Sequence, residues 1–206
     1  MNLRTLHRLS AFLIAAFAAV HIANHLASLA SISAHLRFME VARALYRQPF
    51  VEGILLACVT FQCASGLWLV FAGWKQRRGT VAWVQAASGF YLALFLLIHV
   101  AAVMFGRAAL GLDTNFFYAA AGIHVPPFQY FFVPYYFLAV VALFIHLGCA
   151  VYWSGPAAVR GRTLAVGVAA VGGAVVSLLL VLSLAGKIQP FEVPASYRST
   201  YVRAGG

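Results

Sequence analysis

The stretch Leu9–Ser31, with the sequence LSAFLIAAFAAVHIANHLASLAS, determines the class of the fold. It contains no Asp, Glu, Lys or Arg, and it exceeds the length of about 20 apolar residues that crosses a bilayer as a helix. Arg4 and Arg8 precede it, as basic residues precede the core of a secretory leader. Because the run is long and further apolar runs follow, we expect a retained first membrane-spanning helix.

Four more stretches meet the same length criterion: Phe50–Trp74, Val81–Gly106, Phe128–Trp153 and Thr163–Leu184. None shows the alternation of apolar and polar residues that is typical of barrel strands. The sequence therefore predicts an all-α integral membrane protein, a five-transmembrane-helix antiparallel bundle forming one domain over residues 1–185. Residues 186–206 are expected to form an extramembrane C-terminal tail.

The overall composition supports a membrane protein and excludes several other classes. Of the 206 residues, 64% are hydrophobic and only 9% are charged, whereas soluble domains carry about 25% charged residues. The net charge of +10 comes from short basic runs between the apolar stretches, so nucleic acid is not an expected partner and the lipid bilayer is. Walker, GxSxG and HExxH motifs are absent, so a self-contained hydrolase is not expected.

The connections between the spans suggest an orientation. The tight loops Lys75–Thr80 and Ser154–Arg162 are basic and share a side with Arg4 and Arg8. The opposite side carries as many basic residues, but they lie in the longer connections Ser33–Pro49 and Arg107–Pro127 and in the tail. Because basic residues in short loops mark the cytoplasmic side, we expect a multi-pass protein of the bacterial inner membrane with its N-terminus in the cytoplasm. Ser33–Pro49 is expected to form an amphipathic interfacial helix.

Four histidines, His21, His25, His99 and His146, fall inside the predicted spans. An imidazole there loses its hydration and needs a partner, which is either a hydrogen bond to a neighbouring helix or a ligand. With a rise of about 1.5 Å per residue, His21 lies about 15 Å from the outer end of the first predicted helix, and His99 lies about 10 Å from the outer end of the third. The two could hold one heme between their helices. His25 matches the depth of His99 equally well, so spacing alone does not choose between His21 and His25.

The inner half of the predicted bundle holds a less complete set of candidate ligands. His146 lies about 10 Å from the cytoplasmic end, and the second span presents Gln62 near that level. An amide is a poor iron ligand and a good hydrogen-bond partner. Arg8, beside His7, is a candidate for a heme propionate or a quinone headgroup, or else a positive membrane anchor. In the outer connections, His35 is expected to face lipid headgroups, and His124 and Asp113 are expected to be solvated.

Several short motifs resemble the five-helix membrane cytochrome b subunits of succinate:quinone and fumarate:quinone oxidoreductases. They are Leu6-His7-Arg8-Leu9-Ser10 with Val20-His21-Ile22-Ala23-Asn24-His25, Phe61-Gln62-Cys63-Ala64-Ser65-Gly66-Leu67-Trp68, Gln85-Ala86-Ala87-Ser88-Gly89 with Ile98-His99-Val100, and Ile145-His146-Leu147. The resemblance covers about residues 3–153. It implies a subunit that binds heme b and exchanges electrons with quinone, attached to flavoprotein and iron–sulfur dehydrogenase subunits.

The resemblance also implies roles for individual residues. In that family the first and third helices hold an outer heme, and the second and fourth hold an inner heme. By position, His21 and His99 become the outer axial ligands, and His146 matches the ligand of the fourth helix. Gln62 stands where the ligand of the second helix is expected, so one heme is expected and the second is not. The chain is then at most the membrane subunit of a quinone oxidoreductase.

Two other hypotheses remain beside the cytochrome. The bundle could be a heme-free structural or assembly subunit whose histidines make hydrogen bonds between helices. It could also be a small transporter or proton channel with a histidine relay. The relay requires a continuous polar path, and the fifth span offers only Ser177 and Ser183.

Overall fold

The computed structural model describes residues 2–154 and 161–202 of the chain. These residues form eight helices and no strand, so the all-α prediction is confirmed. Five helices are long and apolar enough to cross a membrane: α1 (Leu3–Ala27), α3 (Pro49–Ala72), α4 (Thr80–Ala108), α6 (Gln129–Ser154) and α7 (Gly161–Leu184). The chain is thus a multi-pass membrane protein with the predicted number of spans.

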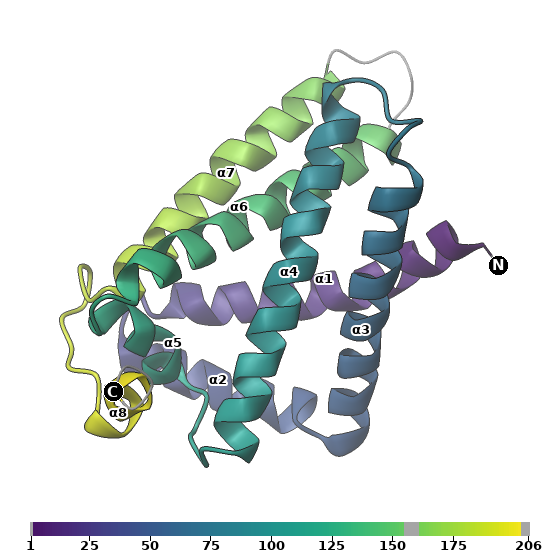
Figure 1. Cartoon of the computed structure of the whole chain (residues 1–206). Coiled ribbons are helices and arrows are strands. Elements are labelled where there is room, and N and C mark those ends of the chain that lie inside the picture. The colour runs from purple at the N-terminus through teal and green to yellow at the C-terminus, as the bar shows by residue number, and fades with distance from the viewer. Residues whose placement is uncertain (1, 155–160, 203–206) are drawn as a thin grey trace.

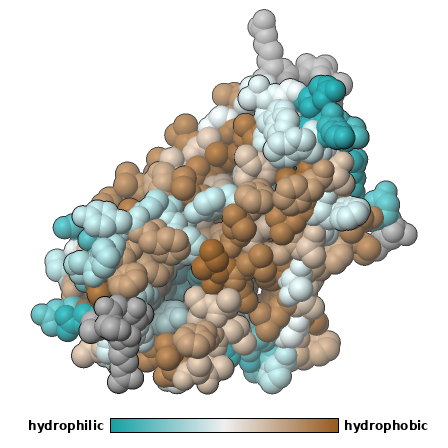
Figure 2. Space-filling view, in the orientation of Figure 1, coloured by the Kyte–Doolittle hydropathy of each residue, from teal (hydrophilic) through white to brown (hydrophobic). Residues whose placement is uncertain are grey.

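The spans pack in an antiparallel series. α6 and α7 share the most extensive interface, and α4 packs on α6, α3 on α4, and α1 on α3. In Figure 1, α6 and α7 run side by side, α3 and α4 form a second pair, and α1 crosses behind α3 and α4. Hydrophobic residues cover most of the helical body, and the most hydrophilic residues gather toward its extremities (Figure 2). This distribution suits a helix bundle surrounded by lipid.

The first span differs from its predicted limits of residues 9–31 at both ends. Asn2 caps α1 by accepting a hydrogen bond from the Thr5 amide, so the helix already begins at Leu3. It ends at Ala27, and Ser31 then caps a separate helix, α2 (Ile32–Tyr46). Hydropathy does not detect these caps, because they depend on side-chain hydrogen bonds of individual polar residues. The other spans agree with their predicted limits within two residues at each end.

A cap of three short helices covers the end of the bundle where α1 finishes. It consists of α2, α5 (Phe116–His124) and α8 (Ala195–Val202), which gather in one region of Figure 1 together with the described end of the chain. Its core is formed by Phe116, Ala120, Ala121, Leu184, Val193 and Tyr197, each at most 8% exposed. Residues 186–202 of the expected tail therefore pack against the bundle. The Ser154–Arg162 connection lies largely outside the described residues, as does the end of the tail after residue 202.

Two glycines bring α6 and α7 close together. A Cβ atom at Gly148 of α6 would lie 2.7 Å from the Ala169 Cβ, and one at Gly173 of α7 would lie 2.6 Å from the Phe144 Cβ. By contrast, a Cβ at the neighbouring Gly172 would meet no atom within 4 Å. Close approach at small residues is the usual way in which membrane helices associate.

We expect Gly173→Val to lower the stability of the purified protein by about 1–3 kcal/mol, because overpacking forces α6 and α7 apart. Gly172→Val is the matched control and should change stability little. The thermal unfolding midpoint in detergent measures both variants. Equal midpoints for the two variants would contradict this account of the α6–α7 contact.

Candidate functional site

Four imidazole rings from three helices form a continuous cluster beneath the cap. The ring centroids of His21 and His99 are 6.1 Å apart, those of His21 and His25 are 4.9 Å apart, and those of His25 and His35 are 5.0 Å apart. His21 and His25 come from α1, His99 from α4 and His35 from α2. The cluster therefore joins two spans to the cap.

The histidines of the chain differ in their hydrogen bonding. His7, His35, His124 and His146 each bond a serine hydroxyl or a backbone carbonyl. Within the described residues, no hydrogen bond reaches the rings of His21, His25 or His99. Polar groups in an apolar environment are normally hydrogen-bonded, so these three rings lack the hydrogen bond that a histidine with a purely structural role would make.

The spacing of His21 and His99 suits two ligands on opposite sides of one metal ion. Bonds of about 2 Å from imidazole nitrogens to a metal place the centroids of two such rings roughly 6 Å apart, and the observed separation is 6.1 Å. Phe17 stacks on His21 and Phe95 stacks on His99, which limits rotation of both rings. His25 contacts His21 and His35, and no described ring contact joins it to His99.

The donor set fits an axially ligated heme better than a bare metal ion. Among the described residues, no three side chains of His, Cys, Asp or Glu converge as metal ligands. A heme needs only two protein ligands, because the macrocycle supplies the others. Asn24, between His21 and His25 in the sequence, is a further buried polar residue whose hydrogen bonding is incomplete. It is 5% exposed, and its Oδ1 has no hydrogen-bond partner in the described structure. The described residues thus supply the two imidazoles that such a heme would need.

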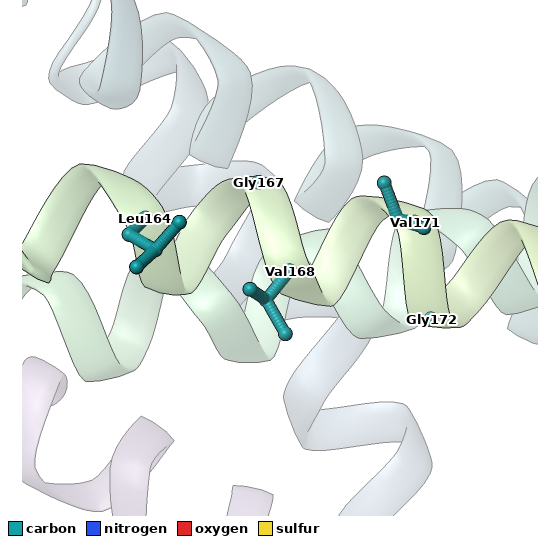
Figure 3. A pocket seen from close by; sticks show the side chains of 5 residues that line it. All are labelled: Leu164, Gly167, Val168, Val171 and Gly172. Atoms are coloured by element: carbon teal, nitrogen blue, oxygen red, sulfur yellow. The ribbon is translucent and has the colours of Figure 1, made fainter.

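Two surface hollows of the described structure lie away from the histidine cluster. One of about 530 Å³ runs along α7 and is lined by Leu164, Gly167, Val168, Val171 and Gly172 (Figure 3). Another, of about 270 Å³, lies between α1 and α6 and is lined by alanines and larger apolar residues. Neither includes a histidine or an ionisable group, so both are apolar surfaces of the kind that lipid chains cover.

In the other half of the bundle, the contacts differ from those expected. Gln62 does not bond His146: its Nε2 donates to the backbone carbonyl of His7, at 2.8 Å. The His146 Nδ1 instead lies 3.2 Å from both the Ser88 Oγ and the Gln85 carbonyl of α4. The depth along a helix predicted the level of these groups but not which neighbour each one faces. Arg8 is exposed and makes no hydrogen bond to the described residues, while His7 next to it is half-buried.

The structure corrects the expectations for the outer connections. His35 does not face headgroups: it is 1% exposed, and its Nδ1 donates to the Asn24 carbonyl at 2.8 Å. Likewise, the His124 Nε2 donates to the Leu184 carbonyl, so this ring serves the cap. Asp113, in contrast, remains exposed as expected, and it pairs with Arg43 at 2.7 Å.

Two ion pairs hold the helix ends around the cluster, and hydropathy did not indicate either of them. Arg43 of α2 binds Asp113 and the Thr114 carbonyl, which ties α2 to the segment before α5. Glu52 near the start of α3 pairs with Arg107 near the end of α4 through both guanidinium nitrogens. These contacts fix the frame within which α1, α2 and α4 present their histidines.

Comparison with known proteins gives no relative. No family model, no curated protein and no solved structure matches the chain.

The buried His35 makes the stability of the cap depend on pH. Burial lowers the pKa of His35 below its ordinary value of 6.5, the nearby Arg43 charge lowers it further, and the bond to Asn24 raises it in part. The folded state therefore binds fewer protons than the unfolded state when the pH falls below about 6.5. Stability is fully present above that pH and is lost as the pH falls toward the depressed folded pKa.

We expect His35→Gln to reduce the loss of stability between pH 8 and pH 5, because a glutamine amide can keep the bond to Asn24 but does not titrate there. Thermal unfolding midpoints of the wild-type protein and the variant at both pH values measure this difference. An identical pH dependence in the two proteins would rule out His35 as a contributor.

Proposed function

We propose that the protein is a membrane cytochrome b-like subunit that binds one heme b between His21 and His99 and transfers electrons to or from quinone. One observation carries the proposal. Two imidazoles, one from α1 and one from α4, have centroids 6.1 Å apart, and neither has a hydrogen bond among the described residues. This spacing suits two axial ligands.

The residues around the pair have separate tasks in this proposal. His21 and His99 hold the iron, while Phe17 and Phe95 keep the two rings in place. The cap covers the His25 side of the cluster, with Phe116 (0% exposed) against His35 and His35 against His25. A bound heme supplies the one-electron chemistry, and the polarity and burial of its surroundings set its potential.

The proposed membrane, orientation and partner subunits rest on the sequence alone. The bacterial inner membrane, a cytoplasmic N-terminus, and flavoprotein and iron–sulfur partner subunits follow from the basic loops and from the family resemblance. Arg8 is exposed at the N-terminal end of α1, a position that suits an anchor or a partner contact better than a buried propionate.

A heme-free structural or assembly subunit is the alternative, and it also has support. Each of the other four histidines makes a hydrogen bond that joins two segments of the chain, as the structural reading requires. The two hypotheses differ at His21 and His99, because only the cytochrome needs one nitrogen of each ring to remain free for the iron.

We expect about one heme per chain in a pyridine hemochrome assay of protein expressed with ample heme. His21→Ala and His99→Ala should each reduce heme to near zero, because the iron loses an axial ligand. His25→Ala is the matched control from the same cluster and should retain most of the heme. A wild-type protein without heme, or variants that lose yield but keep heme, would contradict the proposal.

A further inference from the structure

The loop between α3 and α4 places three basic side chains at the end of the bundle opposite the cap (Figure 1). They are Lys75, Arg77 and Arg78, and the proposed heme site involves none of them. Lys75 and Arg78 are exposed, whereas Arg77 is half-buried. The loop therefore combines two accessible positive charges with one that packs against the protein.

Two indole rings and a backbone carbonyl hold Arg77 in place. Its guanidinium carbon lies 5.0 Å from the ring centroid of Trp83 and 5.9 Å from that of Trp74. The two indoles meet edge to face with centroids 4.9 Å apart, and the Arg77 Nη2 donates to the Val70 carbonyl at 2.9 Å. Because an indole face attracts a cation, Trp74, Arg77 and Trp83 form one packed unit, which we call the Trp–Arg box.

The positive charge of this loop has no counter-ion within the described structure. The Arg77 Nη1 is buried and lacks a hydrogen-bond partner among the described residues. The acidic residues of the chain all belong to the cap end or its connections: Glu40, Glu52, Asp113 and Glu192. The arginines that pair with acids in the described residues lie at that end too. A lasting counter-ion for the loop therefore has to come from another molecule.

Next to the loop, one side of α3 is apolar and open to its surroundings. Trp68 is 65% exposed and Phe71 is 62% exposed, and the spacing of three residues puts both on one side of the helix. Phe71 also contacts Phe90 of α4, with ring centroids 6.3 Å apart, so this apolar side extends across both helices. The basic loop thus adjoins an exposed aromatic surface.

The two surfaces together fit an amphiphile with an anionic head. A phosphate group would lie against the basic loop, and acyl chains would run along the exposed aromatic side of α3. Trp74 and Trp83 are 54% and 41% exposed at the boundary between the two surfaces, where indoles of membrane proteins meet lipid headgroups. An acidic soluble protein would match the charges but would leave the aromatic side uncovered.

We propose that the α3–α4 loop binds the headgroup of an anionic phospholipid, with its phosphate between Lys75 and Arg78 and with the Trp–Arg box as support. Arg78 is already oriented for this role, because its Nη1 donates to the Lys75 and Arg77 carbonyls at 2.9 and 3.0 Å. Its remaining N–H groups make no bond to the described residues and are available to phosphate oxygens. The lipid site is independent of heme, since the His21–His99 pair lies beneath the cap.

The test compares dioleoyl phosphatidylglycerol with dioleoyl phosphatidylcholine, which have the same acyl chains and differ in the charge of the head. Native mass spectrometry of the purified full-length protein in detergent measures the affinity for each lipid. We expect phosphatidylglycerol to bind at least about threefold more tightly, because only its head carries a net negative charge. Equal affinity for the two lipids would overturn the proposal.

Two double variants separate a local site from the net charge of the protein. Lys75→Gln/Arg78→Gln should remove most of the preference for phosphatidylglycerol. Arg4→Gln/Arg37→Gln takes the same charge from two exposed positions outside the loop and should retain the preference. An equal loss of preference in both double variants would overturn the proposal, because it would show attraction by the whole protein rather than by this loop.

Trp83→Leu tests the support that the Trp–Arg box provides. It leaves every charge in place, so a reduced preference for phosphatidylglycerol is expected only if the position of the loop matters. An unchanged preference would overturn the part assigned to the box.

Polyglutamate is the probe for the other class of partner. Equal affinity for the two lipids, with polyglutamate bound by the wild-type protein and not by Lys75→Gln/Arg78→Gln, would overturn the lipid site and assign the loop to an acidic protein.

Discussion

An imidazole removed from water, in the bilayer or in a protein core, must find a partner to replace the lost hydration. Four of the seven histidines in the chain satisfy this requirement within the protein, through serine hydroxyls or backbone carbonyls. His21, His25 and His99 do not, within the described residues, and they lie together beneath the cap. The difference between satisfied and unsatisfied rings is the physical basis for separating scaffold histidines from ligand candidates.

The frame of the bundle was largely predictable from the sequence, because long apolar runs can satisfy their backbone in lipid only as helices. The ends of α1 were not predictable from hydropathy, since they depend on caps at Asn2 and Ser31. The cap was also missed. It forms because Phe116 packs with residues from the end of α7 and from the tail, and contacts so distant in sequence leave no periodic signal.

The depth of the candidate site along the helices was predictable from the sequence, but the partners of each side chain were not. Helix rise placed His21 and His99 at similar depths, and the structure brings their rings together. It could not separate His21 from His25, which lie one turn apart on the same helix. The burial of His35 was missed because it depends on α2 folding back so that His35 bonds the Asn24 carbonyl. The Ser31 cap, four residues earlier, indicates only that His35 lies in the first turns of a helix. Gln62 was placed near the level of His146, but depth does not determine which helix a side chain faces, and Gln62 bonds the His7 carbonyl instead.

The most direct test of the central claim is an electron paramagnetic resonance spectrum of the oxidised, heme-loaded protein. Two imidazole ligands produce low-spin ferric iron, and the 71° angle between the His21 and His99 rings should give a strongly anisotropic low-spin signal. That signal, lost in His99→Ala, is the result that the account predicts. A high-spin signal from five-coordinate iron, or a low-spin signal that survives in His99→Ala, would contradict it.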